Sequence, residues 1–502
     1  MIPRLNRPNQ SSSYRSWPES TSRSTGQLFE GRSRFRKIIV FTDAQLFDSL
    51  GAGWSKEWLL NGLLALQEVT RFHYLDGTLP NEIAPLREIP VPIAPGWVVL
   101  GPEDDGVPRS VFTCAPLGES ISRHGLFGNL TQAVINDTGS AVYQDLSSSA
   151  AGRKRSEDVT ALMAAQALGA DIYVTDRDYL LERRDRFAKE VTVVNADEAL
   201  TVIGLYLRSQ GRYVTWSAAP VGSTEELGQT NYFRIGVWEL LPSWWRWHTA
   251  IAQHGALTSR RGTLGFTFTL IHRLQSVLRE RDHLHVLVNS PQDALSDGEV
   301  LTCVDTILTQ LMAACDVTAR VAHGVVKPEI GFRQSGWQRK DFVDKVGLKS
   351  PELAAIFVHG EMAWSTMRLL AALRNTIHEV AIGAVGIADT GSYRRDRIAL
   401  QISDDSSAGP ESVLSLIQSL GGASEWAVKT FYDDELLFDP RVLVEKILLL
   451  VIEILNLVMD RTPVETLSGV SLSETDVEVP SSTKVAFFTQ MNRESIRWQL
   501  GI

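Results

Sequence analysis

The chain has 502 residues, too many for one hydrophobic core, so two or three domains are expected. Hydrophobic residues make up 44% and charged residues 22%, the composition of a soluble globular protein. A net charge of −10 excludes a large basic surface for general nucleic-acid binding, and three scattered cysteines predict neither a disulfide framework nor a zinc site.

Residues 1–36 are rich in Ser, Arg, Pro and Asn, which predicts a disordered tail. They lack the apolar core of a secretory signal, and few cysteines fit a reducing compartment, so we expect a cytoplasmic protein. The run from Lys37 to Asp43 is continuously apolar and ends in an acid, as expected of a strand buried on both faces. It opens an α/β domain predicted over residues 37–215, with a Pro-rich loop over 77–116.

A second acidic segment lies between Ser156 and Leu180. Asp158 is predicted to start an Ala/Leu-rich helix that ends at Gly169. A short strand over residues 171–175 follows, with acids directly after it at Asp176 and Asp178.

The carboxyl ends of parallel strands share one edge of a sheet, so Asp43 and Asp176 should emerge together, with Asp158 approaching from its helix. Crowded, buried carboxylates repel one another, and Mg²⁺ or Mn²⁺ would relieve that repulsion. Each acid taken alone is also explained by turn formation or by the helix dipole.

The order strand–Asp, helix–Asp, strand–Thr-Asp resembles the PIN-domain nucleases across residues 156–200. Asn195 and Glu198, which have the spacing of a capping box, fit the helix that follows. The resemblance implies a parallel-sheet RNase fold in which three or four carboxylates hold one or two cations that activate water.

Under this resemblance Asp43 matches the first acid and Asp158 the third. The family reads Thr-x-Asp for the fourth, whereas Thr175 is followed at once by Asp176, so Asp176 and Asp178 are both candidates. Glu119 is our choice for the second acid over Glu57 and Glu68. A local basic groove for RNA would come from residues 153–155 and 183–186.

Residues 216–230 read as a linker and 231–462 as a mainly helical domain. The tryptophan cluster at Trp238 and 244–247 is predicted to pack against a neighbouring element rather than to stack on bases. His283-x-His285 is placed in a strand over 284–288, and no third ligand lies nearby in sequence. Ser296 and Glu299 have capping-box spacing and predict the start of a helix.

Ser350-Pro351 predicts the start of another long helix, which carries Arg374, Asn375 and His378 late in its length. The pattern over 297–460 resembles a HEPN-type helical domain. The resemblance implies a homodimer and, where active, His as general acid/base with Arg stabilising the developing charge, without metal. Three residues separate Arg374 from His378, against four to six in the family. An Arg/His pair with local hydrogen bonds is the other interpretation.

Residues 447–459 are apolar but too short and carry a charge, so they predict a core helix rather than a membrane span. Residues 463–502 are assigned to a C-terminal extension.

Two hypotheses follow. In the first, the chain is an Mg²⁺- or Mn²⁺-dependent endoribonuclease of toxin or defence type. Its partners would be RNA, a second copy bound through the helical domain, and an antitoxin or regulator. In the second, both sites have decayed and the chain is an RNA- or protein-binding module. Asp43→Asn and Asp158→Asn should abolish cleavage and leave the fold intact or slightly more stable.

Overall fold

The computed structural model describes most of the chain, and the statements below concern only that part. The described residues are 37–47, 55–75, 96–100, 111–115, 122–125, 134, 137, 139–187, 191–217, 223–258, 262–289, 296–379, 382–388, 396–404, 411–431, 435–473 and 488–502.

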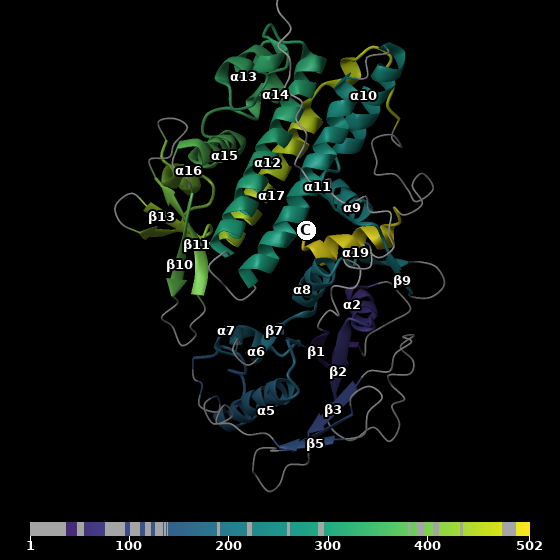
Figure 1. The fold of residues 1–502 in the computed structure, drawn as a ribbon, viewed down its shortest axis with the longest axis vertical. Helices are drawn as coiled ribbons and strands as arrows, with labels where there is room; N and C mark the ends of the chain where they lie inside the picture. Colours follow the sequence, from purple (N-terminus) through teal and green to yellow (C-terminus); the bar gives the residue numbers. More distant parts are fainter. Residues whose placement is uncertain are drawn as a thin grey trace, which may run out of the picture.

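The α/β domain contains a seven-stranded sheet of order β5-β4-β3-β2-β1-β6-β7 (Figure 1). Five strands, from β3 to β7 in that order, are parallel, and β4 and β5 are added antiparallel at one edge. The prediction of a parallel-sheet domain is therefore confirmed. The strands are β1 (Ile38–Asp43), β2 (Val69–Leu75), β3 (Gly96–Leu100), β4 (Val111–Ala115), β5 (Ser122–Gly125), β6 (Ile172–Val174) and β7 (Thr192–Val194).

Helices cover both faces of this sheet. One face packs against α2 (Lys56–Leu64) and α8 (Ala196–Ser209), and the other against α5 (Ser148–Ala167). The predicted capping box of Asn195 and Glu198 is present at the start of α8. The short helices are η1 (Ala44–Phe47), α6 (Asp178–Glu182) and α7 (Arg184–Phe187).

Helix α5 differs from the prediction at its start. It begins at Ser148, capped by the side chain of Ser147, ten residues before Asp158. Asp158 thus lies in the middle of the helix, where the dipole of the first turn does not act on it. Gly169 follows the helix with φ 67°, the left-handed conformation expected of a glycine stop.

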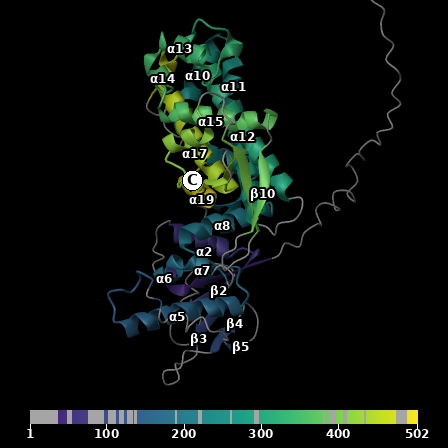
Figure 2. The ribbon, with the colours of Figure 1, turned by 90° about the vertical axis from the view of Figure 1, so that its left-hand side faces the viewer.

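The second half of the chain is a mostly helical domain built around three long helices. These are α11 (Gly262–Asn289), α12 (Ser296–Val326) and α17 (Pro440–Arg461). Figure 2 shows this bundle stacked end to end on the α/β domain. The remaining elements are α9 (Gln229–Leu240), α10 (Trp244–Thr258), η2 (Phe332–Gln334), α13 (Lys340–Gly347), α14 (Pro351–Ala355), α15 (Met362–Glu379), α16 (Val413–Ser419) and η3 (Val464–Thr466).

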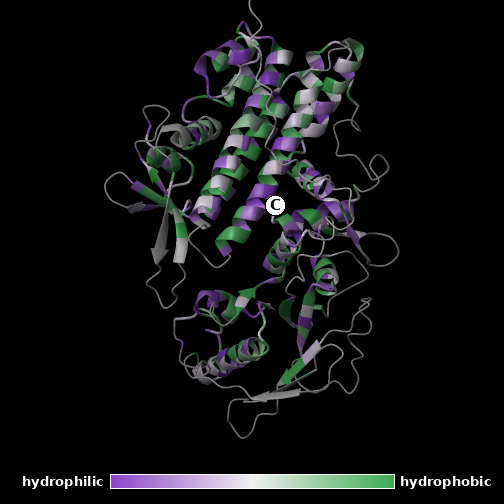
Figure 3. Cartoon of the chain, in the orientation of Figure 1, coloured by the Kyte–Doolittle hydropathy of each residue, from purple (hydrophilic) through white to green (hydrophobic). Residues whose placement is uncertain are grey.

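The interior of this domain is apolar along α12 and α17, as Figure 3 shows by colour. Residues 447–459 lie within α17 and pack in the core as predicted, with Ile447, Val451 and Leu455 buried. One described helix, Asp297–Val326, is long and apolar enough to cross a membrane, but 56% of its most apolar stretch is buried inside the fold. Trp238, Trp244 and Trp247 are likewise buried in this core.

Two local predictions in this half are wrong, and one feature was not predicted. His283 and His285 lie on α11 rather than on a strand. The helix begun at Pro351 stops at Ala355, and Arg374 belongs to a separate helix, α15. A four-stranded antiparallel sheet of order β10-β11-β13-β12 was not predicted. Its strands are β10 (Gly383–Ala388), β11 (Asp396–Ser403), β12 (Lys429–Phe431) and β13 (Glu435–Phe438).

The segment assigned to the linker forms an antiparallel hairpin of β8 (Val214–Ser217) and β9 (Ser223–Glu226). Beside it lies α19 (Gln490–Leu500), which packs against α8 of the α/β domain and α9 of the helical domain. Arg208 of α8 is buried there and bonds to Asp282 of α11 at 2.5 and 3.0 Å and to the carbonyl oxygen of Gln499 at 3.0 Å. The two domains are therefore joined by a buried polar network under the C-terminal helix.

Candidate functional site

Asp43 is the last residue of β1 and is 1% exposed. Its carboxylate accepts hydrogen bonds from the hydroxyls of Tyr173 (2.9 Å) and Thr175 (2.5 Å). Tyr173 and Thr175 lie two residues apart in and after β6, the strand next to β1, so their side chains point to the same face. The parallel register therefore holds both hydroxyls over Asp43.

Asp158 reaches the same place from α5 and is 3% exposed. Its Oδ2 accepts a hydrogen bond of 2.8 Å from the hydroxyl of Tyr143. Tyr143 has φ 64°, a backbone conformation that costs roughly 1–3 kcal/mol outside glycine. The chain thus carries local strain at the residue that holds Asp158.

One guanidinium joins the two acids. Arg177 Nε lies 3.2 Å from Asp43 Oδ2, and Arg177 Nη1 lies 2.9 Å from Asp158 Oδ1. The guanidinium also stands over the ring of Tyr74, 5.3 Å from its centre. The side chain of Arg177 is only 12% exposed, so a cation is enclosed between the two carboxylates.

The pKa values of the cluster reflect two carboxylates that share one guanidinium. Burial raises the pKa of Asp43 and of Asp158, and the neighbouring Arg177 opposes that rise at both. Burial also lowers the pKa of Arg177, but Tyr173 and the two carboxylates outweigh this and raise it above its ordinary value. With both carboxylates ionised, the cluster Asp43–Arg177–Asp158 carries one excess negative charge.

The other predicted acids do not join this cluster. Asp176 is exposed and accepts a hydrogen bond from Gln45 Nε2 at 3.2 Å, and Asp178 is exposed at the start of α6. Glu119 lies outside the described residues. Glu57 sits in the first turn of α2, and Glu68 precedes β2 at the sheet edge opposite Asp43, where it pairs with Arg212.

A cation bound by carboxylates would have to use Asp43 and Asp158, because these are the acids that converge among the described residues. Both are already engaged by Arg177. Sequence reasoning missed Arg177, Tyr143 and Tyr173, although the spacing of Tyr173 and Thr175 was a signal that two polar groups face one side.

The predicted basic groove is largely neutralised. Arg155 is buried and donates to the Val134 carbonyl oxygen at 2.9 Å. Arg183 and Arg186 pair with Asp137 at 3.2 and 3.4 Å, and Arg184 pairs with Glu198. The remaining members of the two segments, Arg153 and Lys154, are exposed.

In the helical domain, Arg374 is half-buried on α15, and its charge acts on Asp316 of α12, lowering a pKa that burial raises. Asn375 and His378 belong to the same helix, but their side chains lie outside the described residues. Most apolar side chains of α17 are packed inside this one chain, and Leu449 is exposed, so α17 offers little apolar surface to a second copy.

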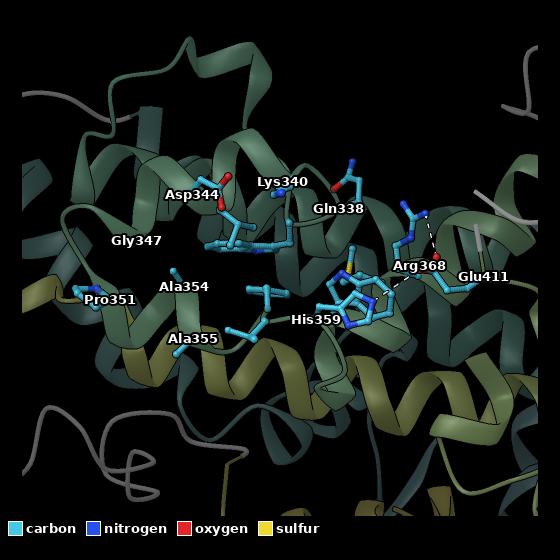
Figure 4. A pocket seen from close by; sticks show the side chains of 16 residues that line it. Gln338, Lys340, Asp344, Gly347, Pro351, Ala354, Ala355, His359, Arg368 and Glu411 are labelled. Atoms are coloured by element: carbon cyan, nitrogen blue, oxygen red, sulfur yellow. Dashed lines mark hydrogen bonds and ion pairs between the residues drawn. The ribbon is translucent and has the colours of Figure 1, made fainter. Parts of the chain in front are cut away.

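The helical domain also contains a pocket of about 780 Å³ (Figure 4). Its apolar lining includes Trp337 and Phe357, whose rings are stacked 4.6 Å apart, and Trp364. At the rim, Arg368 Nη2 lies 3.5 Å from Glu411 Oε2, and His359 lies against Trp364. A pocket of this size with a few polar groups at its rim is typical of small-molecule sites.

Comparison of the chain with models of protein families, with curated proteins and with solved structures finds no match.

Proposed function

We propose that this chain is a binding protein in which a PIN-like α/β domain has exchanged its catalytic metal for the side chain of Arg177. The observation that carries the proposal is the single guanidinium bonded to both Asp43 and Asp158. The cation that a PIN-like cluster needs is thereby supplied from within the chain.

A catalytic metal keeps a coordination position for water or substrate. Around Asp43 each carboxylate oxygen already accepts hydrogen bonds from a hydroxyl and from Arg177. Both acids are almost fully enclosed, so a phosphodiester has no direct approach to them. With few unpaired cations in the predicted basic groove, RNA also gains little attraction there.

The binding activity belongs to the pocket of the helical domain, and its ligand is an aromatic small molecule. Trp337, Phe357 and Trp364 supply flat apolar surfaces. At the rim, Lys340 and Arg368 supply N–H donors, and Asp344 and Glu411 supply carboxylate acceptors. A HEPN-like identity for this domain and a homodimer remain predictions.

The pocket can be tested with anilinonaphthalene sulfonate, a fluorescent aromatic anion. We expect it to bind the wild-type chain with a fluorescence increase and to bind Ala355→Trp at least tenfold more weakly, because an indole would fill the pocket. Leu348→Trp is the matched control, since Leu348 is 76% exposed and does not line the pocket. Equal binding to the wild type and Ala355→Trp would refute this assignment.

The second candidate function is the metal-dependent ribonuclease of toxin or defence type. It is favoured by the convergence of Asp43 and Asp158 at the carboxyl edge of the parallel sheet. In this version Mg²⁺ or Mn²⁺ displaces Arg177 toward solvent. RNA cleavage by the wild-type chain that requires Mn²⁺ and is lost in Asp43→Asn would establish the nuclease and overturn the first proposal.

A further inference from the structure

Three donor groups from α11 and α12 converge well away from the acidic cluster. Cys303 Sγ lies 3.4 Å from His283 Nδ1 and 4.0 Å from Glu280 Oε2. The same glutamate oxygen lies 3.8 Å from His283 Nδ1. All three ligand atoms fall within 4.8 Å of one another.

These separations suit a tetrahedral zinc ion. Zinc binds sulfur at about 2.3 Å and nitrogen or oxygen at about 2.0–2.2 Å, which places neighbouring ligand atoms roughly 3.3–3.7 Å apart. The observed spacings differ from this by a few tenths of an ångström, which side-chain rotation supplies without backbone movement.

The two helices explain why the groups meet. Glu280 and His283 are three residues apart on α11 and share one face. Cys303 lies on α12, which runs back along α11, and brings the thiol to that face. Because 20 residues separate His283 from Cys303, the spacing in the sequence does not display the site.

Carboxylates lie near Cys303. Burial and the carboxylates of Glu280 and Glu299 raise the pKa of the Cys303 thiol to about 11. The one described cation paired with Glu280, besides His283, is Arg279, whose Nε lies 3.7 Å from the other oxygen, Oε1. Without metal the thiol keeps its proton; a divalent cation would displace that proton, and the thiolate and the carboxylate of Glu280 would then balance the charge of the cation.

We propose that Glu280, His283 and Cys303 form a zinc site. Binding breaks the S–H bond of Cys303, forms a zinc–sulfur bond and releases one proton to solvent. His283 is 55% exposed, so the fourth coordination position faces water. The ion would tie α11 to α12 beside Arg281 and Asp282, which take part in the network that joins the domains.

The test uses Co²⁺ as a spectroscopic substitute for Zn²⁺ in the full chain. A cobalt–thiolate bond gives a sulfur-to-metal charge-transfer band in the near ultraviolet, which carboxylate or histidine ligands alone do not give. We expect one equivalent of Co²⁺ to produce this band and Zn²⁺ to remove it. We also expect an increase in Tm with Zn²⁺.

Cys303→Ser should abolish the band, and His283→Ala should weaken Co²⁺ binding at least tenfold. The matched controls are Cys315→Ser, a second buried cysteine of α12, and His272→Ala, an exposed histidine of α11, and both should keep the band. The proposal is overturned if the wild-type chain shows no band, or if Cys303→Ser keeps it. Neither result bears on Arg177 or on the pocket.

Discussion

At the scale of single residues, Arg177 decides the energetics of the acidic cluster. Without it, Asp43 and Asp158 would be two buried carboxylates in contact with hydroxyls alone. Removing one partner of a buried ion pair leaves an uncompensated charge, which costs about 3–5 kcal/mol. The cation therefore stabilises the fold in addition to closing the site.

Arg177→Met should lower the free energy of unfolding by about 3–5 kcal/mol near neutral pH. Loss of the guanidinium raises the pKa of Asp43 and Asp158 further above the unfolded value. Acids with raised folded-state pKa contribute stability at low pH that is lost as pH rises, so the deficit should shrink on acidification. Urea unfolding at about pH 5 and 7 measures this.

The matched variant is Asp43→Asn, which we expect to change stability by less than about 1 kcal/mol, because the cluster holds one carboxylate in excess. Adding Asp43→Asn to Arg177→Met should restore part of the loss. A destabilised Arg177→Met that Mn²⁺ restores would show that the two acids still hold a metal. An unchanged stability of Arg177→Met would contradict the role given to this residue.

His73 gives a second pH dependence. It is fully buried in β2, with Nδ1 2.8 Å from the Thr42 hydroxyl, and burial together with the nearby Arg71 lowers its pKa to about 3. The unfolded chain binds the proton more readily, so stability is present above pH 6.5 and is lost as the pH falls toward 3. His73→Leu should remove this pH dependence, which amounts to on the order of 5 kcal/mol over the whole titration.

The measurement is a series of unfolding curves between about pH 4 and 7.5. His272→Leu, on the surface of α11, serves as the control. A slope identical in the wild type and His73→Leu would contradict the assignment.

The convergence of Asp43 and Asp158 could be predicted from the sequence, because strand ends and helix order place both acids at one edge of the sheet. The position of Arg177 between the two acids could not be predicted from the sequence. It depends on the rotamer of a long side chain and on the exit angle of the chain after β6, neither of which periodicity encodes.

At the scale of helices and strands, local sequence patterns predict the wrong element where tertiary packing favours another one. Residues 284–288 have strand propensity, but they continue a 28-residue helix whose buried face packs on α12. Conversely, the buried strand β1 and the capping box of α8 follow local rules and were predicted. The small sheet β10–β13 is assembled by the antiparallel pairing of β11 with β13, which lie more than 30 residues apart, and no local pattern reveals that contact.

Replacing two helical glycines by alanine should change stability in opposite directions, because one glycine is tightly packed and the other is not. A Cβ on Gly204 of α8 would lie 2.8 Å from Cβ of Gln499 in α19, whereas a Cβ on Gly265 of α11 would meet no atom within 4 Å. Gly204→Ala should therefore destabilise by about 1–3 kcal/mol. Gly265→Ala should stabilise by about 0.5–1 kcal/mol because alanine loses less entropy in a helix. Thermal unfolding of both variants gives the signs, and a stabilised Gly204→Ala would show that α19 does not pack as described.

At the scale of the whole molecule, the buried network around Arg208 couples the domains. Arg208 contacts the helical domain through Asp282 and α19 through the Gln499 carbonyl oxygen. Burial lowers the pKa of Arg208, but the neighbouring Asp282 outweighs this effect and keeps the pKa above its ordinary value. A buried charge cannot be left unpaired without a cost of several kcal/mol. Separating the domains would therefore leave Arg208 and Asp282 without their partners, and this cost opposes the separation.

We expect the wild-type chain to unfold in one calorimetric transition. Arg208→Met should leave Asp282 without its partner and split unfolding into two transitions, with the α/β domain and the helical domain melting separately. Arg212→Met is the control, because Arg212 pairs with Glu68 and Glu226 and with neither α11 nor α19 in these ion pairs. A single transition in Arg208→Met would show that the apolar contacts of α19 alone couple the domains.

The position of α19 also has a consequence for the order of events during synthesis. Thr201 of α8 bonds to the carbonyl oxygen of Trp498, 297 residues later in the chain. At about 5–20 residues per second, roughly 15–60 seconds pass between translation of these two residues. Throughout that interval the surface of α8 that α19 covers, with Arg208 at its centre, is open to solvent. Until α19 has been synthesised, the nascent α/β domain therefore exposes this surface of α8 to chaperones.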